Sequence, residues 1–99
     1  MKYCSIDIET TGLNPKTCDV VQFAAVLDDL DNPKPLKDLP KFLAYIISDS
    51  FRGEPYALSM HPHIFRKIAE ARKNKTYYDE AEHAYYLRIE DLPEIFRNF

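Results

Sequence analysis

The stretch from Lys2 to Leu13, K-Y-C-S-I-D-I-E-T-T-G-L, contains the pattern that decides the fold. Cys4, Ile6 and Ile8 alternate with more polar residues, which predicts a β-strand over residues 2–9 with one apolar face. Cys4 is expected to behave as a small buried hydrophobic residue of that face. The Thr-Thr-Gly and Asn-Pro that follow are turn formers, so the strand should end there.

Two further segments are predicted to be strands. Residues 19–29, D-V-V-Q-F-A-A-V-L-D-D, are apolar on both faces for most of their length and should be buried on both. Residues 41–48, K-F-L-A-Y-I-I-S, have high β-propensity, and a polar loop with three prolines precedes them. Because no helix separates the three strands, they are expected to form an antiparallel meander.

The C-terminal half is expected to supply helices. Pro62 suits the first turn of a helix, and an apolar stripe at helical spacing extends that helix to about Lys73. A turn should follow, and then a helical turn over Glu80–Ala84. A last helix should begin near residues 90–93, where acidic side chains favour a helix start. Its apolar face would be formed by Leu92, Ile95, Phe96 and Phe99. The predicted fold class is therefore α/β, with a three-stranded antiparallel sheet and packed helices in one domain over residues 1–99.

The composition bounds the kind of protein. A chain of 99 residues, 45% hydrophobic and 29% charged, is ordinary for one small globular domain. The net charge of −3 gives no global signal for nucleic acid, although divalent cations neutralise the carboxylates that bind them. No segment approaches the length of a membrane span, so no membrane partner is expected. Two cysteines without a signal peptide favour a reducing, cytoplasmic location.

Two weaker features lie in the second half. One is a basic run, interpreted as a solvated helix face, with a strip that contacts phosphates as the alternative. Its residues are Arg66, Lys67, Arg72, Lys73 and Lys75. The other is His61-Pro62-His63, which with His83 would make a zinc site, although two such histidines at a helix start are usually polar loop residues.

Asp7 and Glu9 are the candidates for chemistry. Alternate residues of a strand share a face, so the two carboxylates point the same way, about 6.6 Å apart by the strand rise. Two buried like charges repel, and a divalent cation such as Mg²⁺ or Mn²⁺ removes that penalty. Two such ions promote in-line phosphodiester hydrolysis. Asp7 is the candidate for the carboxylate that bridges both ions, and Glu9 for the ligand of the ion that activates water.

The turn after Glu9 would contact the substrate. Its backbone N–H groups and hydroxyls are expected to face outward, with Thr10 and Thr11 positioning a terminal 3′ hydroxyl and Leu13 wedged against the terminal bases. Asp-x-Glu alone usually marks the solvent-exposed face of an amphipathic strand. The longer string, which adds Thr-Thr-Gly-Leu and a second apolar strand, is far more specific.

This string resembles the first motif of the DnaQ-like, or DEDD, 3′–5′ exonucleases, which have a ribonuclease H-like fold. The resemblance implies that Asp7 and Glu9 match the first two of four acidic metal ligands. It also implies that Thr10 and Leu13 contact the terminal nucleotide, and that His61 lies near the substrate pocket. The activity implied is hydrolysis of DNA or RNA from its 3′ end with Mg²⁺ or Mn²⁺.

The second and third acidic motifs of that family are not found. Asp79 lacks the required strand context, and Asp91 is better explained by a helix start. Phe99 ends the sequence inside an apolar stripe. The expectation is therefore an N-terminal part of an exonuclease domain, an incomplete ribonuclease H-like fold that lacks two of four ligands and is inactive alone.

Two other classes of protein are considered. The first is a non-catalytic nucleic-acid-binding or protein-interaction scaffold, in which two copies would form a homodimer through the unfinished apolar surface. The second is a different metal-dependent phosphohydrolase or an ATP-binding fold. Thr-Thr-Gly-Leu has only one glycine and cradles phosphates poorly, which disfavours the second class.

Overall fold

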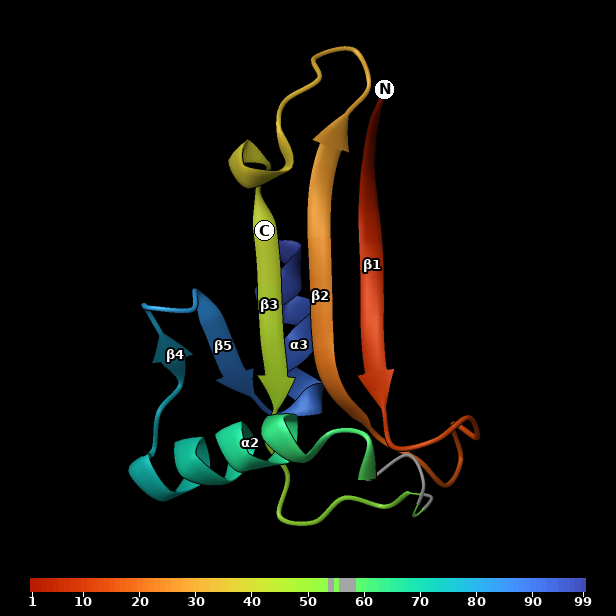
Figure 1. The fold of residues 1–99 in the computed structure, drawn as a ribbon, viewed down its shortest axis with the longest axis vertical. Helices are drawn as coiled ribbons and strands as arrows, with labels where there is room; N and C mark the ends of the chain where they lie inside the picture. The colour runs from red at the N-terminus through yellow and green to blue at the C-terminus, as the bar shows by residue number, and fades with distance from the viewer. Residues whose placement is uncertain (54, 56–58) are drawn as a thin grey trace.

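A computed structural model describes residues 1–53, 55 and 59–99, and its main feature is one five-stranded mixed sheet (Figure 1). The strands are β1 (Lys2–Thr10), β2 (Val20–Asp29), β3 (Lys41–Ile46), β4 (Tyr78–Asp79) and β5 (Ala84–Leu87). The helices are α2 (Pro62–Asn74) and α3 (Leu92–Arg97), with 3₁₀ turns at Leu36–Asp38 and Ile89–Asp91. Among the described residues, no helix is long and apolar enough to cross a membrane.

The sheet order is β1-β2-β3-β5-β4. β1, β2 and β3 form an antiparallel meander, β5 pairs in parallel with β3, and β4 pairs antiparallel with β5. The α/β class and the meander are thus confirmed, whereas the prediction of a sheet with only three strands is wrong. The likeness to the ribonuclease H-like fold stays a prediction.

A hairpin stands where a helical turn was expected over residues 80–84. Residues 80–83 are the turn that joins β4 to β5, and His83 adopts a left-handed backbone with φ of 54°. The Asp79 carboxylate accepts hydrogen bonds from the backbone N–H groups of Ala81 (2.9 Å) and Glu82 (3.4 Å), which holds the turn. The Tyr78 and Tyr85 rings pack with centroids 4.8 Å apart, so cross-strand ring contact also favours the hairpin.

Each face of the sheet is covered by one helix, α2 in front and α3 behind in the view of Figure 1. The core on the α2 side consists of Val21, Tyr45, Ile64, Ile68, Ala71, Ala84 and Tyr86. The core on the α3 side consists of Phe23, Ala25, Phe42, Ala44, Ile46, Leu87 and Leu92. Ile64 and Ile68 of α2 therefore face the sheet as expected, and so does Leu92 of α3. The ring centroids of Phe96 and Phe23 lie 5.0 Å apart.

Burial of β2 is one-sided, contrary to expectation. Phe23 and Ala25 on the α3 side are buried, whereas Gln22 and Ala24 on the α2 side are only partly buried. The reason is visible in Figure 1, where α2 crosses the sheet near one end of the strands and leaves the rest of that face open.

β1 forms one edge of the sheet and is the least covered strand. Ile6 is 52% exposed and Ile8 is 45% exposed. Cys4 is exposed as well, so the prediction that it is buried is wrong. The alternation along the strand was correct, but neither helix extends over this edge (Figure 1).

A polar network ties α2 to the β4–β5 hairpin and to β3. The Tyr45 hydroxyl donates to Glu82 Oε1 at 2.6 Å, and Lys67 Nζ donates to the same oxygen at 2.8 Å. The hydrogen bond to Glu82 raises the pKa of Lys67. Burial raises the pKa of Glu82, but the hydrogen bonds from Lys67 and Tyr45 outweigh it, so that pKa lies below its usual range. The β4–β5 hairpin is thus stabilised by the Lys67–Glu82 ion pair as well as by the packing of the Tyr78 and Tyr85 rings.

Candidate functional site

Asp7 and Glu9 lie on the same face of β1, the face that α2 crosses. In the β1–β2 ladder Asp7 is opposite Ala24 and Glu9 is opposite Gln22, and Gln22 is in turn opposite Tyr45 of the α2-side core. The predicted common orientation of the two carboxylates therefore agrees with the register of the sheet.

The fold brings His61 to Glu9. His61 Nε2 lies 3.6 Å from Glu9 Oε2, and the histidine side chain is largely buried while the glutamate remains partly exposed. His61 occupies the residue before α2, and its carbonyl accepts a hydrogen bond from Phe65 N at 3.1 Å. The first turn of α2 thereby fixes the backbone of His61, whose imidazole lies beside the Glu9 carboxylate. Two residues far apart in the sequence, both predicted from it as site residues, are therefore neighbours.

Asp7 keeps a free carboxylate. The side chain is exposed, and within the described ranges it makes no hydrogen bond or ion pair. Among the described residues, the Glu9 carboxylate contacts only His61. Oxygen ligands with this freedom fit a hydrated divalent cation, which accepts carboxylates and completes its shell with water.

The two threonines of the turn differ sharply. Thr10 Oγ1 donates to the Gly12 carbonyl at 2.9 Å and stays near the surface. Thr11 is fully buried, its hydroxyl donates to the Arg52 carbonyl, and it accepts from Asp19 N at 2.7 Å. The expectation that the Thr11 hydroxyl faces outward is therefore wrong, because the loop after β3 folds over it. Leu13 is 95% exposed, next to this turn in the chain.

Asp19 and Arg52 hold that loop in place and were not singled out from the sequence. Arg52 donates from its backbone N to Asp19 Oδ2 at 2.7 Å and from Nη2 to Asp19 Oδ1 at 2.8 Å. The hydrogen bond from the Arg52 side chain lowers the pKa of Asp19. A Cβ added to the adjacent Gly53 would lie 2.4 Å from Thr11 Cβ, so the loop packs this closely only with glycine there. Gly53 was the one sequence signal for the contact between this loop and Thr11.

Metal-ligating side chains form no larger group in the part of the chain that the structure describes. Over residues 1–53, 55 and 59–99, no group of three or more His, Cys, Asp or Glu residues is placed to hold a metal ion. This holds for the histidines considered for zinc as well, of which His83 contacts the Tyr78 hydroxyl at 3.5 Å. The described part of the chain thus offers a cation no more than two of these side chains at one place.

The basic run along α2 is divided between solvent and ion pairs. Arg66, Lys73 and Lys75 are exposed. Lys67 pairs with Glu82 and Arg72 pairs with Asp49. Only part of the run is therefore free to attract an anion.

No protein-family model matches the chain, and searches of curated proteins and of solved structures find no match either.

Proposed function

We propose that this chain carries half of the metal centre of a 3′–5′ exonuclease of the DEDD class, with a ribonuclease H-like fold. The observation that carries the proposal is the placement of Asp7 and Glu9 on one face of β1, with His61 against Glu9 at the start of α2. The string from Asp7 to Leu13 supplies the chemical interpretation.

Each residue has a defined task in this proposal. Asp7 and Glu9 would hold Mg²⁺ or Mn²⁺, and such ions, when bound, would supply water activation and charge that stabilises a leaving 3′ oxygen. His61 keeps the Glu9 side chain in position from the start of α2. Leu13, almost fully exposed, is available to contact the terminal base of a DNA or RNA strand. Thr10 lies between Glu9 and Leu13 in the sequence, and its backbone would position the terminal nucleotide.

Two carboxylates are too few for a tight two-metal centre. We expect the missing ligands to come from another segment or another chain, and the 99 residues to bind cations weakly and to hydrolyse little alone. A reducing, cytoplasmic setting agrees with the two free thiols, Cys4 and Cys18.

Paramagnetic Mn²⁺ tests the half-site directly, because it broadens the NMR signals of nearby amides. Substoichiometric Mn²⁺ should broaden residues 7–10 and His61, and Asp7→Asn should abolish that broadening. Asp28→Asn is the matched control, since Asp28 lies on the same face at the other end of the β1–β2 ladder and accepts from the Tyr3 hydroxyl. Broadening around residues 7–10 that survives Asp7→Asn would sink the proposal.

A nuclease assay tests the claim that the centre is incomplete. A 3′-labelled oligonucleotide incubated with the pure chain and Mg²⁺ should remain essentially intact. Robust degradation that Asp7→Asn abolishes would show a complete active site and overturn the half-site proposal.

The open edge of β1 favours a second candidate function, a non-catalytic scaffold that self-associates. An uncovered strand of nine residues with exposed Ile6 and Ile8 is a template for pairing with another chain. Two copies would extend the sheet across this edge as a homodimer. Sedimentation should then detect a dimer that Ile6→Lys dissociates, whereas a monomer at all accessible concentrations would exclude it.

A further inference from the structure

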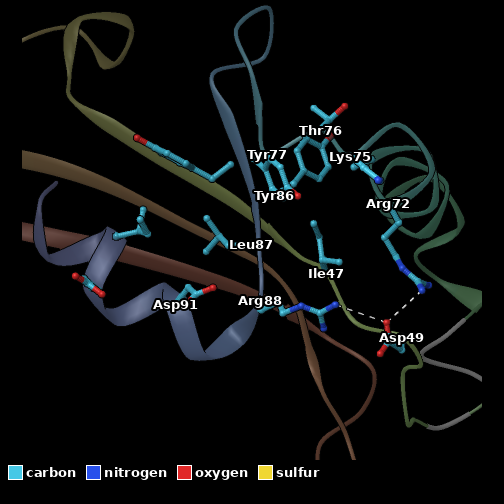
Figure 2. A pocket seen from close by; sticks show the side chains of 14 residues that line it. Ile47, Asp49, Arg72, Lys75, Thr76, Tyr77, Tyr86, Leu87, Arg88 and Asp91 are labelled. Carbon is cyan, nitrogen blue, oxygen red and sulfur yellow. Dashed lines mark hydrogen bonds and ion pairs between the residues drawn. The ribbon is translucent and has the colours of Figure 1, made fainter.

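A pocket of about 520 Å³ opens at the far end of α2 from His61 (Figure 2). The C-terminal end of α2, the residues after β3, strand β5 and the start of α3 surround it. Its apolar lining comes from Ile47, Ala71, Tyr86 and Leu87. The volume lies within the range of small-molecule sites, and the lining is of the type that buries an apolar ring.

Two guanidinium groups converge at the mouth of this pocket. Arg72 Nη2 lies 3.3 Å and Arg88 Nη2 lies 3.7 Å from the same atom, Asp49 Oδ1. Figure 2 shows the two arginines reaching that carboxylate from different elements. Asp49 is itself 79% exposed, so a solvent-facing carboxylate occupies the position that an external anion could take. Guanidinium groups bind phosphate oxygens in the same way that they bind carboxylates.

The charges of the pocket are separated into two ends. Lys75 lines it beside Arg72, and its ammonium group has no hydrogen-bond or ion-pair partner in the described part of the chain. With Asp49 included, this end carries a net charge of about +2, which matches a phosphate monoester near neutral pH. Asp91 and Glu94 line the pocket from the α3 side, and Asp91 lies across from Arg72 and Lys75 in Figure 2.

We propose that this pocket binds a nucleoside monophosphate. Arg72, Arg88 and Lys75 hold the phosphate, and Asp49 turns into solvent as it enters. The base lies against the apolar lining, where the mostly exposed Tyr77 offers a ring face. Asp91 and Glu94 repel the phosphate and accept hydrogen bonds from ribose hydroxyls or base amino groups, which sets the direction of the ligand.

The pocket is separate from the Asp7–Glu9 pair. His61 contacts Glu9 at the start of α2, whereas Arg72 lies near its end, about 17 Å away by the helical rise. The proposal therefore stands or falls independently of the exonuclease proposal.

Titration of the whole chain with 5′-AMP, adenosine and inorganic phosphate, in EDTA to exclude divalent metals, tests the assignment. Calorimetry or NMR should detect saturable binding of 5′-AMP below about 1 mM and much weaker binding of the other two. Arg72→Gln and Arg88→Gln should each weaken 5′-AMP binding about tenfold or more. Asp49→Asn should tighten it severalfold, because the competing carboxylate is gone. Arg66→Gln, which removes an exposed charge of α2 outside the pocket, is the matched control and should change nothing.

Three results would overturn the proposal. The first is the absence of saturable 5′-AMP binding. The second is adenosine or inorganic phosphate binding as tightly as 5′-AMP. Equal binding of adenosine would mean that the phosphate contributes nothing, and equal binding of phosphate would mean that the base contributes nothing. The third is 5′-AMP binding that Arg66→Gln weakens as much as Arg88→Gln does. The expected gain from Asp49→Asn keeps the test informative even if an arginine variant folds poorly.

Discussion

The two edges of the sheet are built in opposite ways. At one edge β1 runs for nine residues with isoleucine side chains in solvent and no helix over it. At the other, β4 and β5 are short, their tyrosine rings pack on each other, and Lys67 and Tyr45 bind Glu82 of the hairpin. Stability is thus concentrated at the β5 side, whereas Asp7 and Glu9 lie at the side that is left open.

This difference fits the proposed exonuclease half-site. Metal-bound phosphates and their water would need access to Asp7 and Glu9, and a strand at an uncovered edge would provide it. The same openness makes β1 the surface through which another chain would pair. The helices explain the asymmetry, since α2 and α3 both pack nearer to β3 and β5 than to β1 (Figure 1).

The largest expected effect compares one isoleucine from each side of the molecule. Ile68 is buried against the sheet, so Ile68→Ala should lower the free energy of unfolding by about 2–4 kcal/mol through lost packing and the cavity that remains. Ile6→Ala, at a half-exposed position, should cost less than about 1 kcal/mol. Urea denaturation of both variants checks the ranking. Equal losses would mean that β1 is covered in solution.

A medium effect separates the two adjacent threonines of the β1–β2 turn. Thr11→Val should cost about 1–3 kcal/mol, because the partly buried Arg52 carbonyl and Asp19 N–H lose the buried Thr11 hydroxyl that both contact. Thr10→Val loses one hydrogen bond to the Gly12 carbonyl near the surface and should stay within about 0.5 kcal/mol. Urea denaturation of the two threonine variants checks this difference in the free energy of unfolding. A larger loss for Thr10→Val would contradict the assignment of Thr11 as the anchor of the loop.

The smallest effect is a pH dependence at the Asp19–Arg52 contact. The hydrogen bond from Arg52 lowers the folded-state pKa of Asp19, so the contact stabilises the fold above the unfolded value of about 3.9. That contribution is lost as the pH falls through the lower folded-state pKa. Wild type should therefore exceed Asp19→Asn in urea midpoint at pH 7 and 5, and the gap should close as the pH falls through the lowered folded-state pKa of Asp19. A gap independent of pH would refute the ionic origin of the contact.

Local patterns predicted the long elements well. Two periodic patterns carried these predictions: the alternation around Ile6 and Ile8, and the helical spacing of Ile64 and Ile68. Each pattern predicts its element without any knowledge of what the element packs against. The β4–β5 hairpin was missed because Glu80 to Glu82 are ordinary helix residues, and the turn depends on a left-handed His83 in place of glycine. Burial of Cys4 was predicted wrongly because alternation specifies a face but not what covers it.

The candidate site was predictable only as a list of residues. Asp7 and Glu9 were placed on one face by strand geometry alone. The contact of Glu9 with His61, and the Thr11, Asp19 and Arg52 cluster, depend on how distant loops meet. The first contact depends on where α2 docks, and the second on how the loop after β3 folds over the β1–β2 turn; no local pattern encodes either.

The parallel pairing of β3 with β5 has a consequence for how the chain folds. Ala44 and Tyr85 are ladder partners, so their pairing closes a long segment of the chain that includes α2. The meander of β1 to β3 needs only short loops to close. Because distant pairings are reached late, a nascent chain should hold β1 to β3 first and acquire its last two strands in the slow step. Until β5 pairs, both β1 and β3 would be unpaired edge strands of the partly folded sheet. Each edge would then be open to pairing with another chain.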